Sequence, residues 1–245
     1  MARYETKYVR CNFRKITMII VKNVVKKFKM GSIESTVLKG IDFTVPKGQF
    51  LAITGRSGSG KSTLLYQLGL LDHPTEGSII INDEVVTNLY GSKRIEFRRK
   101  NLGYIFQDYA ILPTLTAKEN VILPMMMGDN QKNDIKQRAK DALGKVGLEK
   151  QINNLPSQLS GGEQQRVGIA RAIAHNPSII FADEPTANLD TESSQVVLDI
   201  FLKLNSEGQT IIMVTHEPEY AKLADRIIEI SDGRIVSDKN ISNKY

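Results

Sequence analysis

The stretch Gly55-Arg-Ser-Gly-Ser-Gly-Lys-Ser62 decides the fold of this 245-residue chain. It fits the pattern G-x-x-x-x-G-K-[S/T], in which the glycines let the backbone curl so that its N–H groups point inward at a phosphate. A β-type run over residues 50–54 precedes the loop, and a helical pattern over residues 62–71 follows it. That order of strand, loop and helix confirms the motif and predicts a nucleotide-binding P-loop protein.

The loop and the start of its helix supply the first set of candidate site residues. Lys61 is expected to reach the β- and γ-phosphates, and the Ser62 hydroxyl is expected to bind Mg²⁺. The positive end of the helix dipole adds to the attraction for phosphate. The candidate nucleotide-binding residues are Gly55, Arg56, Ser57, Gly58, Ser59, Gly60, Lys61, Ser62 and Thr63.

A second acidic motif closes an apolar strand at Ile179-Ile-Phe-Ala-Asp183-Glu184. Carboxylates at the carboxyl end of a buried parallel strand lie where ligands bind in α/β sheets. We therefore expect Asp183 to hold Mg²⁺ through water. Glu184, one residue further, is expected to polarise the water that attacks the γ-phosphate.

A second helix start of the anion-binding kind occurs at Leu159-Ser-Gly-Gly-Glu-Gln-Gln-Arg166. Ser160 offers a hydroxyl, and Gly161 and Gly162 allow close backbone approach. One nucleotide does not need two such cradles from one subunit. The pattern therefore indicates that this cradle serves a nucleotide held by another copy of the chain.

Taken together, these motifs resemble the ATP-binding cassette (ABC) ATPase family over about residues 19–237, with LSGGE as the most specific match. The resemblance implies that ATP is the nucleotide, and it assigns four more residues by their place in family motifs. Gln107 matches the glutamine that contacts Mg²⁺ and the attacking water, and Asp190 ends the D-loop that crosses the dimer interface. His216 matches the histidine that contacts the γ-phosphate. Phe28 matches the aromatic that stacks on adenine, where the family commonly has tyrosine.

The fold class predicted in this way is α/β: a P-loop NTPase of RecA-like type with a parallel sheet core, an N-terminal antiparallel β subdomain and an inserted helical subdomain. Apolar strands at 178–182 and 209–215 alternate with helical patterns, as a covered parallel sheet requires. The predicted divisions are a basic N-terminal extension at 1–17, an ABC ATPase domain at 18–237 with the helical subdomain at about 92–160, and a C-terminal tail at 238–245.

Charge and composition limit the other possibilities. The chain carries a net +6, and residues 1–17 hold five basic residues against one acid. That segment could contact anionic lipid or nucleic acid, but a solvated arm is the simpler interpretation. No uncharged apolar run approaches the roughly 18 residues of a membrane helix. The single cysteine, Cys11, excludes an intrachain disulfide.

The run LPTLTAKENVILP within residues 106–124 is similar to the ABC subfamily of lipoprotein-releasing, macrolide-exporting and antimicrobial-peptide-handling ATPases. This resemblance implies an ATP-hydrolysing subunit, peripheral on the cytoplasmic face of the cell membrane. It would dimerise head to tail on ATP and drive a membrane permease that docks on the helical subdomain. Residues 125–127, three methionines, either line the docking groove or simply pack.

Two alternatives remain. The chain could be a cell-division-type ABC ATPase, or a soluble one that acts on nucleic acid or ribosomes and is not coupled to transport. Soluble relatives of that kind usually carry two cassettes, coiled-coil insertions or metal-binding cysteines. The sequence has none of these features, so we expect no nucleic-acid partner.

Overall fold

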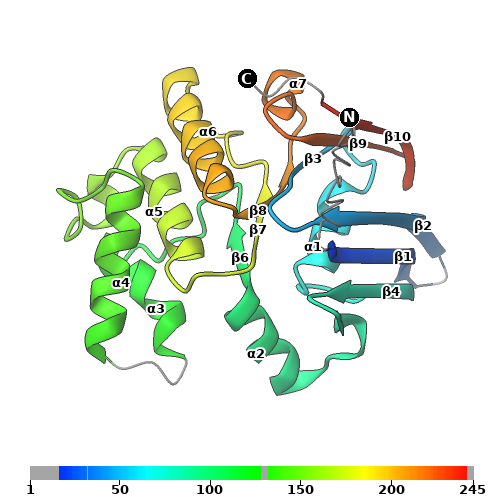
Figure 1. The fold of residues 1–245 in the computed structure, drawn as a ribbon, viewed down its shortest axis with the longest axis horizontal. Helices are drawn as coiled ribbons and strands as arrows, with labels where there is room; N and C mark the ends of the chain where they lie inside the picture. Colours follow the sequence, from blue (N-terminus) through cyan, green and yellow to red (C-terminus); the bar gives the residue numbers. More distant parts are fainter. Residues whose placement is uncertain (1–16, 32, 128–131, 242–245) are drawn as a thin grey trace, which may run out of the picture.

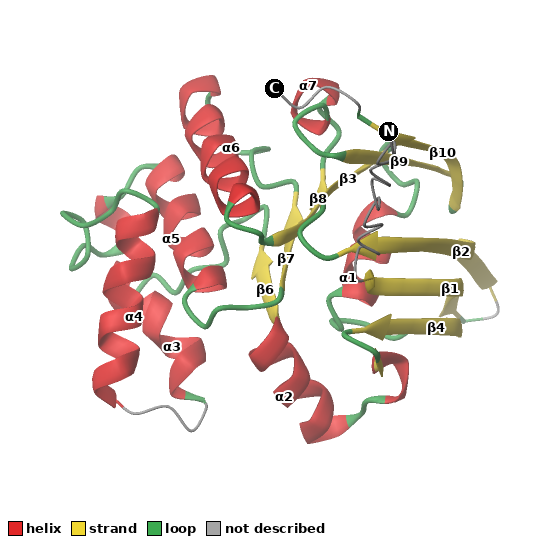
Figure 2. Cartoon of the chain, viewed as in Figure 1, coloured by secondary structure: helices red, strands yellow, loops and turns green. Residues whose placement is uncertain are grey.

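The computed structural model describes residues 17–31, 33–127 and 132–241. The extension predicted at 1–17 therefore lies outside the described residues except for Thr17, which begins a strand. Figure 1 shows two sheets side by side, with helices α3, α4 and α5 grouped at the side far from the N-terminal strands. The same view coloured by secondary structure separates the helical part from the strand-rich part (Figure 2).

The larger sheet has six strands in the order β10-β9-β3-β8-β7-β6. Neighbouring strands are parallel except for the edge pair β9 and β10, which is antiparallel. Alternate residues of the central strands enter different cores: Phe50 and Ala52 pack with the helical side, whereas Leu51 and Ile53 pack toward the other sheet. The central strands are therefore buried on both faces, as their continuous apolar runs predict. Its strands are β3 (Phe50–Thr54), β6 (Leu102–Ile105), β7 (Ile179–Asp183), β8 (Thr210–Val214), β9 (Arg226–Ser231) and β10 (Arg234–Asn240).

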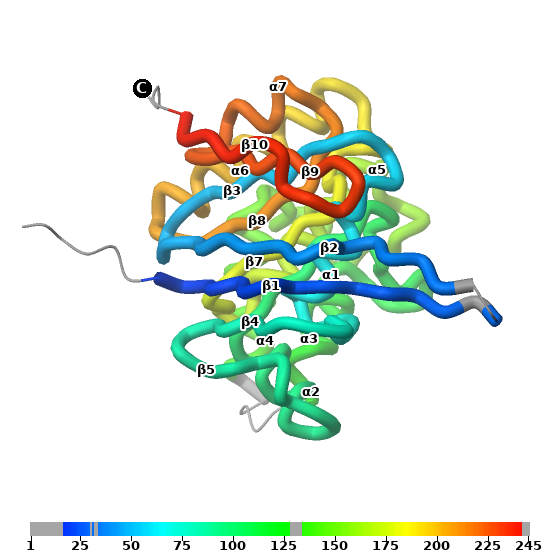
Figure 3. The backbone as a smooth tube through the Cα atoms, turned by 90° about the vertical axis from the view of Figure 1, so that its right-hand side faces the viewer, coloured from blue at the N-terminus to red at the C-terminus, as the bar shows by residue number. Residues whose placement is uncertain are grey.

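The smaller sheet is the predicted antiparallel β subdomain, with the order β2-β1-β4-β5. Its long strands lie across the molecule in Figure 3. The strands are β1 (Thr17–Met30), β2 (Ile33–Pro46), β4 (Glu76–Ile81) and β5 (Glu84–Val85). The sequence alone predicts a first strand over residues 19–25, a β-branched run, but β1 continues to Met30.

The helices complete the architecture. α1 (Lys61–Leu68) follows the P-loop, and α2 (Gly91–Asn101) leads into β6. Packed against one another are α3 (Ala117–Met126), α4 (Lys132–Lys145) and α5 (Gly161–Ile173). The remaining helices are α6 (Thr191–Ser206) and α7 (Pro218–Ala221), with 3₁₀ turns at Val86–Asn88 and Pro156–Gln158. β6 lies inside the range 92–160 that we predicted as helical, and it belongs to the six-stranded sheet.

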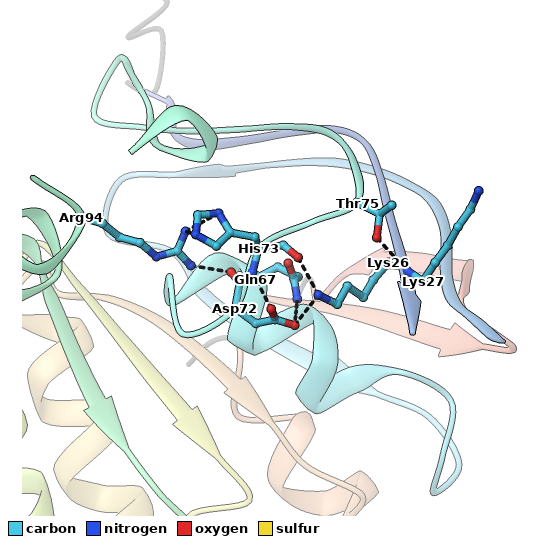
Figure 4. Close-up of polar contacts among 7 residues, drawn as sticks. All are labelled: Lys26, Lys27, Gln67, Asp72, His73, Thr75 and Arg94. Atoms are coloured by element: carbon cyan, nitrogen blue, oxygen red, sulfur yellow. Dashed lines mark hydrogen bonds and ion pairs between the residues drawn. The ribbon is translucent and has the colours of Figure 1, made fainter. Parts of the chain in front are cut away.

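A polar group that we call the Asp72 cluster joins β1, α1 and α2 (Figure 4): Lys26, Gln67, Asp72, His73 and Arg94. The Lys26 ammonium lies 2.7 Å from Asp72 Oδ2, which also accepts a hydrogen bond of 3.0 Å from Gln67. Arg94 is buried, donates to the carbonyls of Leu70 and Asp72, and lies 2.7 Å from the imidazole nitrogens of His73. These contacts fix the position of α2 relative to the smaller sheet.

Candidate functional site

The P-loop leaves the carboxyl end of β3 in a conformation that requires glycine. Gly55 has φ +143°, and a Cβ there would lie 2.1 Å from the Ile230 carbonyl oxygen. Gly60 has φ +104° and caps α1 without a side-chain hydrogen bond. The tip residues Arg56, Ser57 and Gly58 are exposed. The first N–H groups of α1 therefore have no capping side chain and are placed to bind an anion.

Lys61 lies folded back over this loop. Its side chain is buried, and Nζ donates to the carbonyls of Gly55 and Arg56, both at 3.0 Å. The Ser59 hydroxyl beside it is buried and has no hydrogen-bond partner within the described part of the chain. Thr63 follows Ser62 on the first turn of α1 and is partly buried. The loop thus holds one buried ammonium and one unsatisfied hydroxyl, a set that suits phosphate oxygens.

Asp183 meets the P-loop from the end of β7. The Ser62 hydroxyl donates to its Oδ1 at 3.0 Å, which joins the carboxyl ends of β3 and β7. Burial raises the pKa of Asp183, while hydrogen bonds from Ser62 and Tyr66 act in the opposite direction. A desolvated carboxylate next to a hydroxyl is a donor set that suits Mg²⁺.

Glu184 and His216 meet at the ends of β7 and β8. Glu184 has φ +43°, a conformation that is strained for a residue with a side chain. Its N–H donates to the Val214 carbonyl at 3.0 Å, and its Oε2 lies 2.9 Å from Nδ1 of His216. The other ring nitrogen of His216 lies 3.2 Å from Glu217. This strained backbone conformation directs the Glu184 carboxylate toward His216.

The remaining predicted residues make no hydrogen bond to this group among the described residues. Gln107 is exposed just beyond β6, and Phe28 is 42% exposed on β1 with the Lys26 ammonium 4.9 Å from its ring centroid. Within residues 17–31, 33–127 and 132–241, no hydrogen bond joins Gln107, Phe28 or the signature at 160–162 to Ser62 and Asp183.

The signature begins α5 with a capping box. Ser160 Oγ accepts from the Glu163 N–H at 3.2 Å, and the Glu163 carboxylate accepts from the Ser160 N–H at 2.8 Å. A Cβ on Gly162 would lie 2.6 Å from Ser193 Oγ, so only glycine lets α5 approach α6 this closely. Asp190 caps α6, because its carboxylate accepts from the Ser193 N–H at 2.8 Å and from the Ser193 hydroxyl at 2.9 Å.

An apolar groove of about 770 Å³ opens between α2, α3, α5 and β6. Its walls include Leu71, Ile95, Leu102, Leu123, Pro124 and Met127, with arginines at the edge. Met127 is 76% exposed, whereas Met125 is buried in the core. Of the two alternatives for the three methionines, packing applies to Met125 and lining a groove applies to Met127.

Sequence reasoning missed several residues around Gln107. The Tyr109 hydroxyl donates to the Asn188 carbonyl at 3.2 Å, and Arg171 donates to the carbonyls of Tyr109 and Ala110. Tyr109 and Ala110 adopt left-handed φ angles without being glycine, so no turn signal marks this segment in the sequence. Asn188 was visible only as a member of the D-loop motif.

None of the helices in the described residues combines the length and the apolar character that crossing a membrane requires. Among the same residues, no group of three or more His, Cys, Asp or Glu side chains is arranged to hold a metal ion. The candidate ligands for Mg²⁺ remain the Ser62 hydroxyl, Gln107, Asp183 and the nucleotide itself.

Comparison with known proteins gives consistent matches over nearly the whole chain. The model of the ABC transporter family matches residues 38–187. An uncharacterized ABC transporter ATP-binding protein of Methanocaldococcus jannaschii is 50% identical over 219 residues, which cover 89% of this chain and 98% of that protein. The lipoprotein-releasing system ATP-binding protein LolD of Aquifex aeolicus is 48% identical over 82% of this chain and 90% of its own length.

Longer proteins and solved structures match as well. The macrolide export ATP-binding/permease protein MacB of Bartonella henselae is 47% identical over 92% of this chain, which spans 34% of MacB. The ATP-binding cassette MJ0796, solved as a dimer in a post-hydrolysis state bound to ADP and Pi, superposes with a TM-score of 0.85. It is 39% identical, and the match covers 93% of this chain and all of the cassette.

Proposed function

This chain belongs to the ABC transporter family as an ATP-binding ATPase, and we propose that it drives a membrane permease by dimerising head to tail on ATP. The observation that carries the proposal is that Ser62 hydrogen-bonds Asp183, whereas no hydrogen bond among the described residues joins residues 160–162 to either of them. Two phosphate-binding helix starts that do not meet in one chain fit a site completed by a second copy. The dimeric cassette MJ0796 supports this arrangement.

We assign the roles at the nucleotide as follows. The P-loop backbone and Lys61 bind the β- and γ-phosphates, and Ser62 and Asp183 hold Mg²⁺, Asp183 through water. When bound, Mg²⁺ neutralises charge that develops on the phosphate oxygens. Gln107 contacts the metal and the attacking water, and Phe28 stacks on adenine. Exposure of the Phe28 ring supports that last role, because a stacking face must be open to its ligand.

Glu184 is the proposed general base. Its carboxylate follows Asp183 directly and points to His216, the residue that we assign to the γ-phosphate. Residues 160–162 and Asp190 would act on the nucleotide of the other copy. In support, Ser160 is exposed at the start of α5, and the Asp190 cap is exposed at the start of α6.

The apolar groove is the proposed docking site for a helix of the permease, which would place the chain on the cytoplasmic face of the membrane. The relatives LolD and MacB favour an exporter or a mechanotransmission complex for lipoprotein, peptide or macrolide-like cargo. A cell-division-type or soluble ATPase without transport coupling remains the alternative. It would leave the groove without a permease.

Co-purification after mild detergent extraction tests the proposal. The wild-type chain should bring down a permease, and Ile95→Glu should lose it, because the charge enters an apolar wall where Ile95 is 57% exposed. Val236→Glu is the matched control, since Val236 is 58% exposed on β10 and outside the groove lining. Equal recovery of a permease by both variants, or none by the wild type, would contradict docking in this groove.

A further inference from the structure

The turn at residues 107–110, just beyond β6, is held in an unusual backbone conformation. Tyr109 has φ +58° and Ala110 has φ +50°, two consecutive left-handed residues that are not glycine. Residues with a Cβ adopt this conformation in sequence only where the surroundings hold them there. The contacts of this turn therefore decide its shape, and they come from two elements that serve ATP.

The first contact comes from α5, the helix that begins with the signature. Arg171 extends from the last turn of α5 and donates to the carbonyl oxygens of both left-handed residues, with 3.1 Å to Tyr109. The planar guanidinium donates from two separate nitrogens, Nη1 to Ala110 and Nη2 to Tyr109, whereas lysine would have to serve both carbonyls from one nitrogen. Arg171 therefore clamps the backbone of this turn to the helix that carries residues 160–162.

The second contact comes from the D-loop. The Tyr109 hydroxyl donates to the Asn188 carbonyl at 3.2 Å, and the Asn188 amide donates back to the Gln107 carbonyl at 3.2 Å. The same hydroxyl lies where a Cβ on Gly161 would approach it to 2.9 Å. The ring of Tyr109 thus places one hydroxyl between the D-loop and the first turn of the signature helix.

We infer that Tyr109 and Arg171 are positioning residues that tie the turn after Gln107 to the signature and to the D-loop of the same chain. This inference rests on the proposed function, in which Gln107 acts on the chain's own nucleotide and residues 160–162 act on the other copy's. A shift of this one turn then alters both ATP sites of the dimer. The apolar groove is also lined by Phe106, Ala110 and Arg171, so a molecule bound in the groove would contact the same turn.

The first test removes a single hydroxyl. Tyr109→Phe in a Glu184→Gln background should raise the ATP concentration needed for half-maximal dimerisation about fivefold, the factor of one neutral hydrogen bond. ATP affinity of the monomer should not change, because the P-loop is untouched. In the otherwise wild-type chain, the ATP concentration for half-maximal turnover should rise in the same direction, because hydrolysis requires the dimer. Analytical ultracentrifugation and steady-state ATPase assays give these readouts.

The second test uses a pair of matched arginines. Arg171→Lys removes the double clamp and should weaken dimerisation in the same way. Arg138→Lys is the control, because Arg138 also donates to a carbonyl at the end of α5, that of Ala174 at 3.0 Å, but does not touch the turn. A merely structural role for Arg171 predicts equal losses of thermal stability and equal dimerisation for the two variants.

The outcomes separate this inference from the function on which it rests. If Glu184→Gln alone does not dimerise with ATP, the proposed head-to-tail function fails. If that protein dimerises, and Tyr109→Phe and Arg171→Lys leave its ATP dependence unchanged, the function stands and the positioning role is refuted. A rise in monomer Kd for ATP in either variant would also refute it, because the effect would then act through the P-loop.

Discussion

Glu184 and Glu217 both contact His216, yet only Glu184 directly follows the strand that carries Asp183. Glu184 approaches Nδ1 at 2.9 Å, and Glu217 approaches Nε2 at 3.2 Å. Glu184→Gln keeps the size of the side chain and a carbonyl oxygen but removes the base. We therefore expect turnover to fall roughly 10²–10⁴-fold, the typical contribution of a positioned general base.

Glu217→Gln is the matched control, because it removes the other carboxylate from the same imidazole. Glu217 is 51% exposed, against 21% for Glu184, and a polar contact between exposed side chains contributes about 0–1 kcal/mol. Its loss should therefore reduce turnover by no more than about fivefold. Phosphate release under saturating ATP measures both variants, and gel filtration with ATP shows whether Glu184→Gln accumulates as a dimer.

The comparison has a clear refuting result. If both variants lose activity to the same small extent, the carboxylates act by orienting His216, and the base lies elsewhere. Near-normal turnover in Glu184→Gln would move the role to an arrangement of Gln107 and His216. If Glu184→Gln loses ATP binding as well as turnover, the strained turn at φ +43° has a structural role that glutamine does not support.

The other predictions concern the cradles, the fold and pH. Lys61→Ala should weaken ATP binding by the monomer, whereas Ser160→Arg should leave ATP binding nearly unchanged and abolish dimerisation. Mixing the two variants should restore partial ATPase activity if the sites assemble between copies. No recovery of activity on mixing would contradict this assembly. Gly55→Ala should lower the free energy of unfolding in urea by about 2 kcal/mol or more, because a Cβ there meets a carbonyl oxygen at 2.1 Å. Gly58→Ala is the control: nothing lies within 4 Å of its Cβ, so the free energy of unfolding should fall by only about 1 kcal/mol. Burial, with a neighbouring guanidinium, lowers the pKa of His73 below its usual 6.5, so the unfolded chain takes up the proton more readily and stability should decline as pH falls below about 6.5. His73→Asn should flatten that decline between pH 7 and 5, and an unchanged slope would refute the assignment.

The strands of the larger sheet could be predicted closely because their local composition, a continuous run of apolar residues, indicates burial. β7 and β8 are fully buried apolar runs, and both were expected within one residue of their observed ends. The end of β1 was not predicted, because the last residues of this strand are rich in lysine. Lys27 lies 3.6 Å from Glu34 on the neighbouring strand and 3.2 Å from Glu76 near β4. Pairing with distant acids extends the strand, and a local pattern does not contain that information.

The candidate site was likewise predictable only where local sequence determines it. Lys61, Ser62, Asp183 and Glu184 could be placed from sequence, because each follows a strand that ends at one edge of the sheet. The contacts of Tyr109 could not, since they depend on left-handed residues that carry no glycine signal and on an α5 that starts 52 residues later. β6 escaped prediction for a related reason: its four residues directly follow the charged helix α2, and such a short apolar run cannot be distinguished from a helix.

Three polar side chains of the two phosphate cradles already have hydrogen-bond partners in the free chain. Lys61 donates to its own loop, Ser62 donates to Asp183, and Ser160 accepts from Glu163. ATP must therefore exchange these hydrogen bonds rather than add to them, and exchange contributes little net free energy. The net gain has to come from groups that lack such partners, the uncapped first N–H groups of α1 and the buried Ser59 hydroxyl. It follows that the backbone of the P-loop contributes to the affinity of the free chain together with the charge of Lys61, and that Lys61→Ala should weaken ATP binding without abolishing it.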